Sequence, residues 1–216
     1  QRQMCIRDSD GPVAPADWRG ALPVTYRLGG GRALVRLKAE FDWNLVPTYN
    51  VIAKMKGAVS PDQWVLRGNH HDAWVIGARD PISGLVPLLE QARALGELAK
   101  TGWRPRRTLV FCAWDGEEPG LLGSVEWCEH HAAELQRKAV AYINTDSNAR
   151  GFLSIGGSHS LESLAADVAH RVNDPLTGIS ASERLRASLL VRGTAAQRAE
   201  FLNRRDLRLK ALGSGS

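Results

Sequence analysis

The chain has few cysteines and no long apolar run. A membrane-spanning helix needs about 18 or more consecutive apolar residues, and no stretch of this 216-residue sequence approaches that length. The three cysteines form no Cys-x-x-Cys pair, so neither a zinc ribbon nor a disulfide framework is predicted. We therefore expect no membrane segment in this chain, and we interpret Cys112 and Cys128 as core or near-core residues.

Charge of one sign is not in large excess either. The formal net charge is +5, and 44% hydrophobic with 24% charged residues is the composition of an ordinary globular protein. Between positions 180 and 210 arginines gather, but Phe201 is the only aromatic residue there that could stack on a base. We therefore expect no nucleic-acid partner. We expect these arginines on a helix face that is solvated or packed on other parts of the protein. The arginines are Arg184, Arg186, Arg192, Arg198, Arg204, Arg205 and Arg208.

Both ends of the sequence are unusual. The string from Met4 to Ser9, MCIRDS, resembles the translation of a sequencing adapter, so residues 1–10 are predicted to be an artefact. Residues 212–216 read LGSGS, a flexible composition without a strand or helix pattern. We therefore expect a piece of a longer gene, truncated at both ends.

Hydrophobic patterning predicts an α/β fold. A period of two or a short apolar run is typical of strands and occurs in five segments: 32–41, 49–56, 63–67, 108–113 and 140–143. A further short strand is expected near 152–155. Helical periodicity or composition occurs in four segments: 83–100, 121–138, 161–172 and 180–210. This alternation predicts a sheet with helices on both faces.

Polar clusters follow three of these strands directly. They are GNHHD at 68–72, WDGEE at 114–118 and NTD at 144–146. In an open α/β sheet the carboxyl ends of the strands meet at one edge, and ligands bind in the crevice there. An imidazole and several carboxylates brought to one edge supply the nitrogen and oxygen ligands that zinc takes. The sequence therefore predicts a metal site and metal-dependent hydrolysis.

The adjacent acids Glu117 and Glu118 have two interpretations. They could form a solvated acidic turn, or they could lie at a metal, since burying two acids together is costly unless a cation or a proton offsets their charge. His70 could likewise be structural. Asp72, two residues further on, could accept its imidazole proton and orient the ring as a ligand.

Asp80 and Asp146 also have simpler interpretations. Asp80 could be a turn residue before Pro81, with Ser83 as a possible helix N-cap, and Asp146 could be a loop acid. Because all these acids lie at successive strand ends, we favour one shared site. We also predict that the Asp80–Pro81 peptide bond is cis, a geometry that costs an X-Pro bond only about 0.5–1 kcal/mol.

The motifs together resemble the zinc exopeptidases related to glutamate carboxypeptidase II, metallopeptidase family 28. Five segments carry the resemblance: HHDAWV at 70–75, DP and SG between 80 and 84, GWRPRRT at 102–108, WDGEEPGLLGS at 114–124 and YINTD at 142–146. The resemblance covers most of residues 49–216. It implies a central mixed, largely parallel sheet flanked by helices. Residues 11–45 resemble the tail of a protease-associated (apical) domain and linker, and 46–216 the peptidase core.

The resemblance also implies metal ligands. His70 and Asp146 would hold one zinc ion, Glu118 would hold a second, and Asp80 would bridge the two. A further histidine ligand of the second zinc lies, in the family, beyond where this chain stops. None of the other histidines matches it, and we expect them at the surface: His130, His131, His159 and His170.

Catalytic roles follow from the same resemblance. Glu117 would be the general base, and Asp72 would orient the zinc-binding imidazole. The substrate would be a peptide or an N-acylated amino acid, and the intact protein would be a homodimer outside the cytoplasm (periplasmic, secreted or membrane-anchored). Glu126 and Glu129 align with calcium ligands of the family, but a solvated helix face is the better interpretation here.

Two alternatives remain open. The transferrin receptor resembles these enzymes in fold without their chemistry, so a catalytically inactive binding protein of that type is possible. The chain could also be an inactive gene fragment, and we expect this piece alone to lack activity even where the intact enzyme has it.

Overall fold

The computed structural model describes residues 11–29 and 36–204. Its contacts divide the chain into two compact units, residues 1–46 and 47–216, and each is considered by itself. The expected adapter segment 1–10 and the closing residues 212–216 lie outside the described residues. None of the described helices combines the length and the apolar character that a bilayer span requires.

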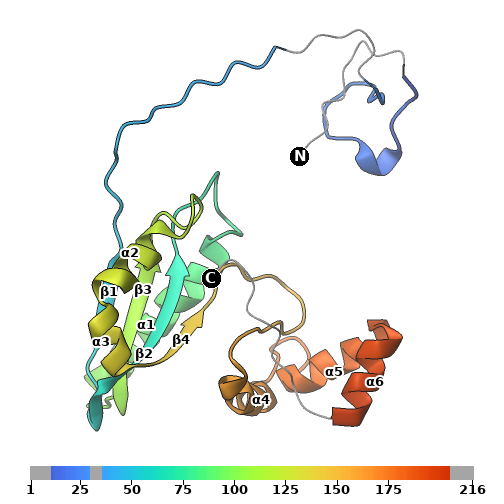
Figure 1. Ribbon diagram of the computed structural model, residues 1–216. Coiled ribbons are helices and arrows are strands. Elements are labelled where there is room, and N and C mark those ends of the chain that lie inside the picture. Colours follow the sequence, from blue (N-terminus) through green and yellow to red (C-terminus); the bar gives the residue numbers. More distant parts are fainter. Residues whose placement is uncertain (1–10, 30–35, 205–216) are drawn as a thin grey trace. The chain divides into compact units, whose positions relative to one another are not determined.

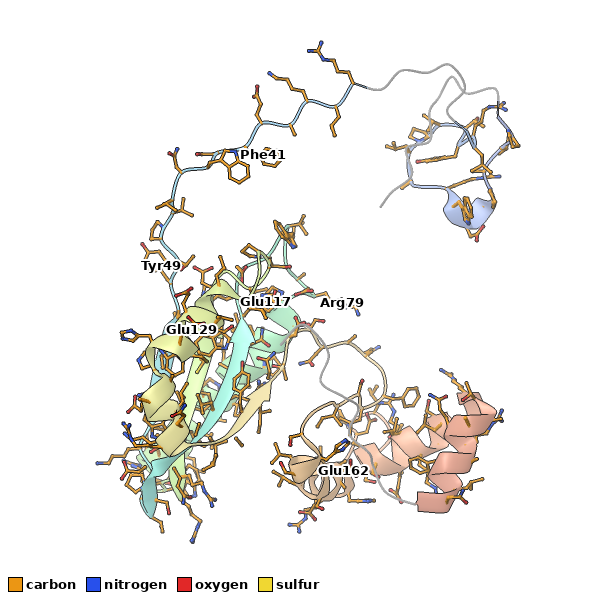
Figure 2. The ribbon with its side chains drawn as sticks, in the orientation of Figure 1. Phe41, Tyr49, Arg79, Glu117, Glu129 and Glu162 are labelled. Carbon is orange, nitrogen blue, oxygen red and sulfur yellow. The ribbon has the colours of Figure 1, made fainter. Side chains whose placement is uncertain are left out.

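The first unit contains little regular structure among its described residues. A short 3-10 helix, η1 (Ala16–Trp18), lies between the two residues of an isolated bridge, Val13 and Arg27. The strand expected over 32–41 is wrong over its described part: residues 36–41 are extended, exposed and unpaired with any described strand. Figure 2 shows the Phe41 side chain on this segment, where it is 69% exposed. Alternation predicted a strand face, but a strand also needs a neighbouring backbone to pair with.

The second unit contains a four-stranded sheet of order β1-β3-β2-β4 (Figure 1). Its strands are β1 (Val51–Met55), β2 (Ser60–His70), β3 (Arg107–Trp114) and β4 (Ala139–Asn144). β2 is parallel to both β3 and β4, whereas β1 runs antiparallel to β3. The expected mixed, largely parallel sheet is therefore confirmed.

One face of this sheet holds the hydrophobic core. Alternate residues of two strands form it, because successive strand side chains point to opposite faces: Trp64 and Leu66 from β2, and Val110, Cys112 and Trp114 from β3. Trp127 of α2 (Leu122–His130) and Leu135 of α3 (Ala132–Lys138) pack against this cluster. The two short helices therefore cover this face.

The other face packs on α1 (Ile82–Lys100), which contacts β2 and β3. Asn69 and Phe111 point to this side, and both are buried. The expectation of helices on both faces is met. α1 follows β2 in the chain and α2 follows β3, so both crossovers begin at the edge where the parallel strands end.

Three further helices follow the sheet. They are α4 (Glu162–Arg171), preceded by the 3-10 turn η2 (His159–Leu161), then α5 (Ala181–Arg192) and α6 (Ala195–Arg204). α5 contacts both α4 and α6. The short strand expected at 152–155 is wrong, since these residues form no strand. Arg184 also departs from a solvated face, because it is partly buried, pairs with Asp174 and lies over the Phe152 ring.

Several local predictions need correction. The single helix expected over 121–138 is two helices, separated at His131, whose ring stacks on Trp127 and is therefore partly buried. Ser83 is not the N-cap of α1: its hydroxyl donates to the Arg79 carbonyl instead. Cys112 is buried as expected, but Cys128 is exposed.

Candidate metal centre

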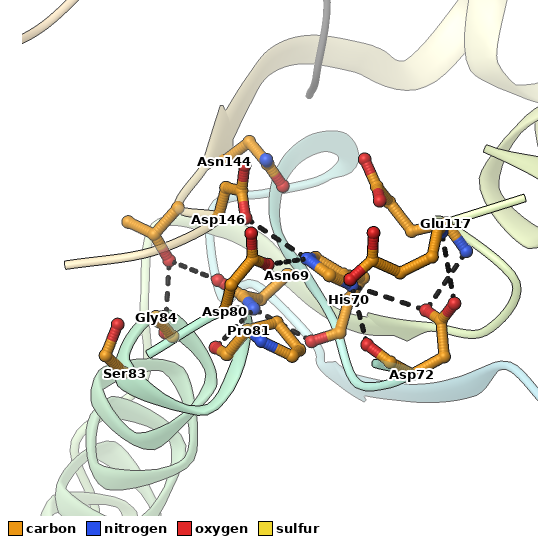
Figure 3. A network of polar contacts seen from close by, with 12 residues as sticks. Asn69, His70, Asp72, Asp80, Pro81, Ser83, Gly84, Glu117, Asn144 and Asp146 are labelled. Carbon is orange, nitrogen blue, oxygen red and sulfur yellow. Dashed lines mark hydrogen bonds and ion pairs between the residues drawn. The ribbon is translucent and has the colours of Figure 1, made fainter. Parts of the chain in front are cut away.

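Three segments deliver the candidate ligands to one edge of the sheet. β2 ends at His70, and β4 ends two residues before Asp146. Because β4 runs parallel beside β2, with Gly68 paired to Asn144, Asp146 emerges next to His70 (Figure 3). Asp80 arrives from the loop that precedes α1.

The imidazole of His70 lies at the centre of this group. Its Nε2 is 3.1 Å from Asp80 Oδ1 and 3.1 Å from Asp146 Oδ1. The histidine side chain is 3% exposed, while those of Asp80 and Asp146 are 55% and 39% exposed. The imidazole ring is therefore buried, whereas the two carboxylates are partly exposed. A cation from solvent could reach their oxygens.

The donor set fits zinc. One ligand atom from each of His70, Asp80 and Asp146 lies within 4.8 Å of the others, and no other such group of three occurs among the described residues. An imidazole nitrogen with carboxylate oxygens is a combination that zinc accepts. Glu118 follows β3 at the same edge but does not belong to this group, so its predicted role at a second ion stays a prediction.

The carboxylate of Asp72 holds two parts of the site together. Its Oδ1 is 3.3 Å from His70 Nδ1, and its two oxygens accept the backbone N–H groups of Glu117 at 3.0 Å and Glu118 at 3.1 Å. Partial burial would raise the pKa of Asp72, but the two N–H donors and the imidazole outweigh burial and lower it. Asp72 therefore stays charged to a lower pH than an ordinary aspartate does.

The turn after β3 carries Glu117 and Glu118 between the strand and α2, as the sequence predicted. Gly116 has a φ of 65°, a conformation that glycine adopts at little cost. Partial burial raises the pKa of Glu117, and the neighbouring carboxylates of Asp146, Glu118 and Asp72 raise it further against the opposing effect of His70. In the metal-free protein Glu117 therefore keeps its proton to a higher pH than an ordinary glutamate does.

The pKa of His70 is raised as well. Burial alone would lower it, but hydrogen bonding to Asp146 and Asp72 and the charge of Glu117 outweigh burial. In the absence of a cation the ring therefore keeps its proton to a higher pH than a free imidazole does.

The Asp80–Pro81 peptide bond is cis, so this sequence-based prediction is confirmed. Pro81 is fully buried, and its carbonyl accepts the backbone N–H groups of Gly84 and Leu85 in the first turn of α1. Asp80 is therefore attached directly to the start of a helix.

The sequence also matches known proteins. The profile of peptidase family M28 matches residues 50–187. The chain belongs to peptidase family M28. The chain is 42% identical over 172 residues to probable glutamate carboxypeptidase VP8 of Zea mays, covering 79% of this chain and 24% of that M28 relative. It is 45% identical over 146 residues to aminopeptidase NAALADL1 of Mus musculus, covering 63% of this chain and 20% of that protein.

Solved structures are similar over part of the chain. A peptidase M28 precursor from Shewanella amazonensis is 30% identical, with a TM-score of 0.46 over 61% of this chain and 29% of the other. The chain spans about a quarter or less of the length of the two M28 relatives above, 24% and 20%.

Sequence reasoning missed two polar residues beside the ligands, the buried Asn69 and the partly buried Thr145. Asn69 and Thr145 directly precede His70 and Asp146, and they hydrogen-bond to each other at 2.8 Å. Both residues lie inside the polar clusters GNHHD and NTD, but neither was assigned a role from the sequence alone. Their position, one residue before each ligand at a strand end, was the available signal.

Proposed function

We propose that the full-length protein is a zinc-dependent exopeptidase that hydrolyses peptides or N-acylated amino acids. The observation that carries this proposal is the convergence of His70, Asp80 and Asp146 at the carboxyl edge of a parallel sheet in a chain of peptidase family M28. Relatives of this chain are named as carboxypeptidases and as an aminopeptidase. The proposal therefore covers cleavage at a chain end without choosing which end, and homodimer formation stays a prediction.

The proposed ligands divide between two ions. His70 and Asp146 would hold one zinc, Glu118 would hold the other, and Asp80 would bridge them. When bound, zinc lowers the pKa of a coordinated water to about 7 and polarises a carbonyl oxygen. The remaining chemistry belongs to the side chains around it.

Glu117 is the proposed general base. A general base works best when its pKa lies near the working pH, and partial burial, the largest cause, raises the pKa of Glu117 in that direction. Its carboxylate would take a proton from the attacking water and return it to the leaving amine. Asp72 would meanwhile keep His70 Nδ1 occupied, so that Nε2 points to the ligand side.

Glu117→Gln tests this assignment in the full-length protein. The amide preserves shape but cannot accept the proton, so kcat should fall by about 10²–10⁴-fold while bound zinc, measured by elemental analysis, stays unchanged. Glu126→Gln, an exposed glutamate on α2, is the matched control and should keep full activity. Turnover of the Glu117 variant within a few-fold of wild type would remove it from the role of base.

The zinc content of the unmodified protein distinguishes the proposed enzyme from the alternative, an inactive binding protein. A catalytically inactive protein of transferrin-receptor type should not retain two zinc ions through dialysis. We expect about two equivalents in the full-length protein, and loss of peptidase activity on chelation that added zinc restores. A protein that purifies without zinc and takes none up would contradict the proposal.

A further inference from the structure

A buried amide joins the segments that carry the candidate ligands. Asn69 is 0% exposed. Its Nδ2 donates to the backbone carbonyl of His70 at 2.8 Å and to that of Pro81 at 3.3 Å. Its Oδ1 accepts from the hydroxyl of Thr145 at 2.8 Å. Both ends of this one side chain are therefore hydrogen-bonded.

Each contact of the amide falls on or beside a ligand. His70 is itself a candidate ligand, and Pro81 follows Asp80 (Figure 3). Thr145 directly precedes Asp146. The two ligands on either side of His70 come from positions 10 and 76 residues away. A single side chain thus contacts all three backbone segments at the point where each presents its ligand.

The hydroxyl of Thr145 has a fixed orientation. It accepts from Arg67 Nη2 at 2.8 Å and lies 2.8 Å from Asn69 Oδ1 and 3.1 Å from the Gly84 carbonyl. A hydroxyl has one proton, so with the guanidinium donating to its oxygen, that proton is directed to Asn69 Oδ1, the nearer of the two acceptors. The chain before Asp146 is also held by the Thr145 N–H, which donates to the Gly68 carbonyl at 3.2 Å.

The first turn of α1 closes the arrangement. A Cβ added at Gly84 would lie 2.0 Å from the Asp146 carbonyl oxygen and 2.4 Å from Asn69 Oδ1. Only a residue without a side chain permits this approach. The helix start, the amide and the segment of Asp146 are therefore packed against each other without free space between them.

We propose that Asn69 is a positioning residue of the metal centre: it fixes the mutual distances of His70, Asp80 and Asp146 and so sets zinc affinity without contacting the ion. This inference rests on the proposed function. Ligands held at the right separation lose less conformational freedom on binding, and residues that orient metal ligands typically change affinity about 10–100-fold when replaced.

The test measures zinc affinity of the full chain by competition with a chromophoric chelator. Asn69→Ala and Thr145→Val should each weaken binding about 10–100-fold, whereas Thr145→Ser, which keeps the hydroxyl, should stay within about three-fold. The double variant Asn69→Ala/Thr145→Val should bind no more weakly than about the weaker single variant, because both changes break the same link.

Thr108→Val is the matched control. The Thr108 hydroxyl also joins two segments, since it accepts from the Gly57 N–H at 3.1 Å and donates to the Pro61 carbonyl at 2.7 Å, but at the start of β3 rather than at its carboxyl end. This variant should lower the melting temperature of the metal-free protein and leave zinc affinity unchanged. If it weakens zinc binding as much as Thr145→Val does, the link acts only through general stability and the inference is overturned.

The possible outcomes distinguish the positioning role of Asn69 from the proposed function. Zinc binding by wild type with unchanged affinity in Asn69→Ala overturns the positioning role alone. No zinc binding by wild type overturns the proposed function, and the positioning role with it. If Asn69→Ala does not fold, the pair Thr145→Val and Thr145→Ser decides, because equal affinities in these two variants would exclude a role for the hydroxyl link.

Discussion

The buried imidazole of His70 contacts different groups through its two ring nitrogens. Its Nε2 meets two partly exposed carboxylates, while its Nδ1 meets Asp72, which also accepts two backbone N–H groups from the turn of Glu117. The position of the ring and the position of that turn therefore depend on the same carboxylate.

Asp72→Asn should lower the free energy of unfolding of the metal-free protein by an amount that depends on pH. The pKa of Asp72 is lower in the folded state than in the unfolded state, so its contribution is present above the unfolded value of about 3.9 and is lost as the pH falls through the folded value. The raised pKa of His70 works in the opposite direction: that contribution is present below about pH 6.5 and is lost as the pH rises through the folded value.

The stability difference between wild type and Asp72→Asn should therefore be largest near pH 5–6, at about 2 kcal/mol, shrink steeply in acid and decrease partly in alkali. Urea unfolding of the metal-free proteins between pH 3 and 9 measures it. A difference that does not change across this range would show that Asp72 acts only through shape.

The sequence could predict the contacts of residues with distinctive chemistry. The interval of two residues between His70 and Asp72 was enough to expect their contact, because the backbone itself brings the two side chains together. Asn69 gave no such signal, since its role depends on which carbonyls lie nearby after folding. Ser83 gave a misleading one: α1 already begins at Ile82, so Ser83 lies inside its first turn and its hydroxyl donates to the Arg79 carbonyl.

At the scale of elements, the site depends on strand order. β2 lies between β3 and β4, so the acids that follow its two neighbours reach the edge on either side of His70. Sequence predicted this convergence because parallel strands end at one edge. It could not predict the order itself, which depends on how the crossover helices pack. The break of the helix after β3 at His131 was also unpredictable, because no glycine or proline marks it.

Two glycines of α1 should respond in opposite ways to alanine. Gly84→Ala would place a Cβ 2.0 Å from the Asp146 carbonyl oxygen, and forcing a methyl group into such packing costs about 1–3 kcal/mol. Gly96 has nothing within 4 Å of its added Cβ, so Gly96→Ala should stabilise the protein by up to about 1 kcal/mol through helix propensity.

Thermal unfolding of both variants measures this contrast, and zinc titration adds a second one. Gly84→Ala should also bind zinc more weakly, because it displaces the segment of Asp146, while Gly96→Ala should bind as wild type does. Equal stabilisation by both alanines would mean that the close approach at Gly84 is not present in solution.

At the scale of the whole molecule, the six predicted site residues all lie in the unit 47–216. Tyr49, near its beginning, is held to the sheet edge by hydrogen bonds from its N–H to Asp115 and from His71 to its carbonyl. A chain that begins at residue 47 should therefore retain the zinc affinity of the longer chain within about three-fold. Isothermal titration of both chains checks this, and a loss of ten-fold or more would assign the first 46 residues a part in forming the site.

The separation of the ligands along the chain has a consequence for folding. His70 and Asp146 are 76 positions apart, with the three helices of two crossovers between them, and meet only once β4 has paired with β2. Pairing over such a distance is slow, because the entropy of closing the loop is lost before any contact compensates for it. A zinc ion that binds both His70 and Asp146 therefore finds its complete site only late in folding. Zinc should therefore lengthen the lifetime of the native protein without accelerating its formation.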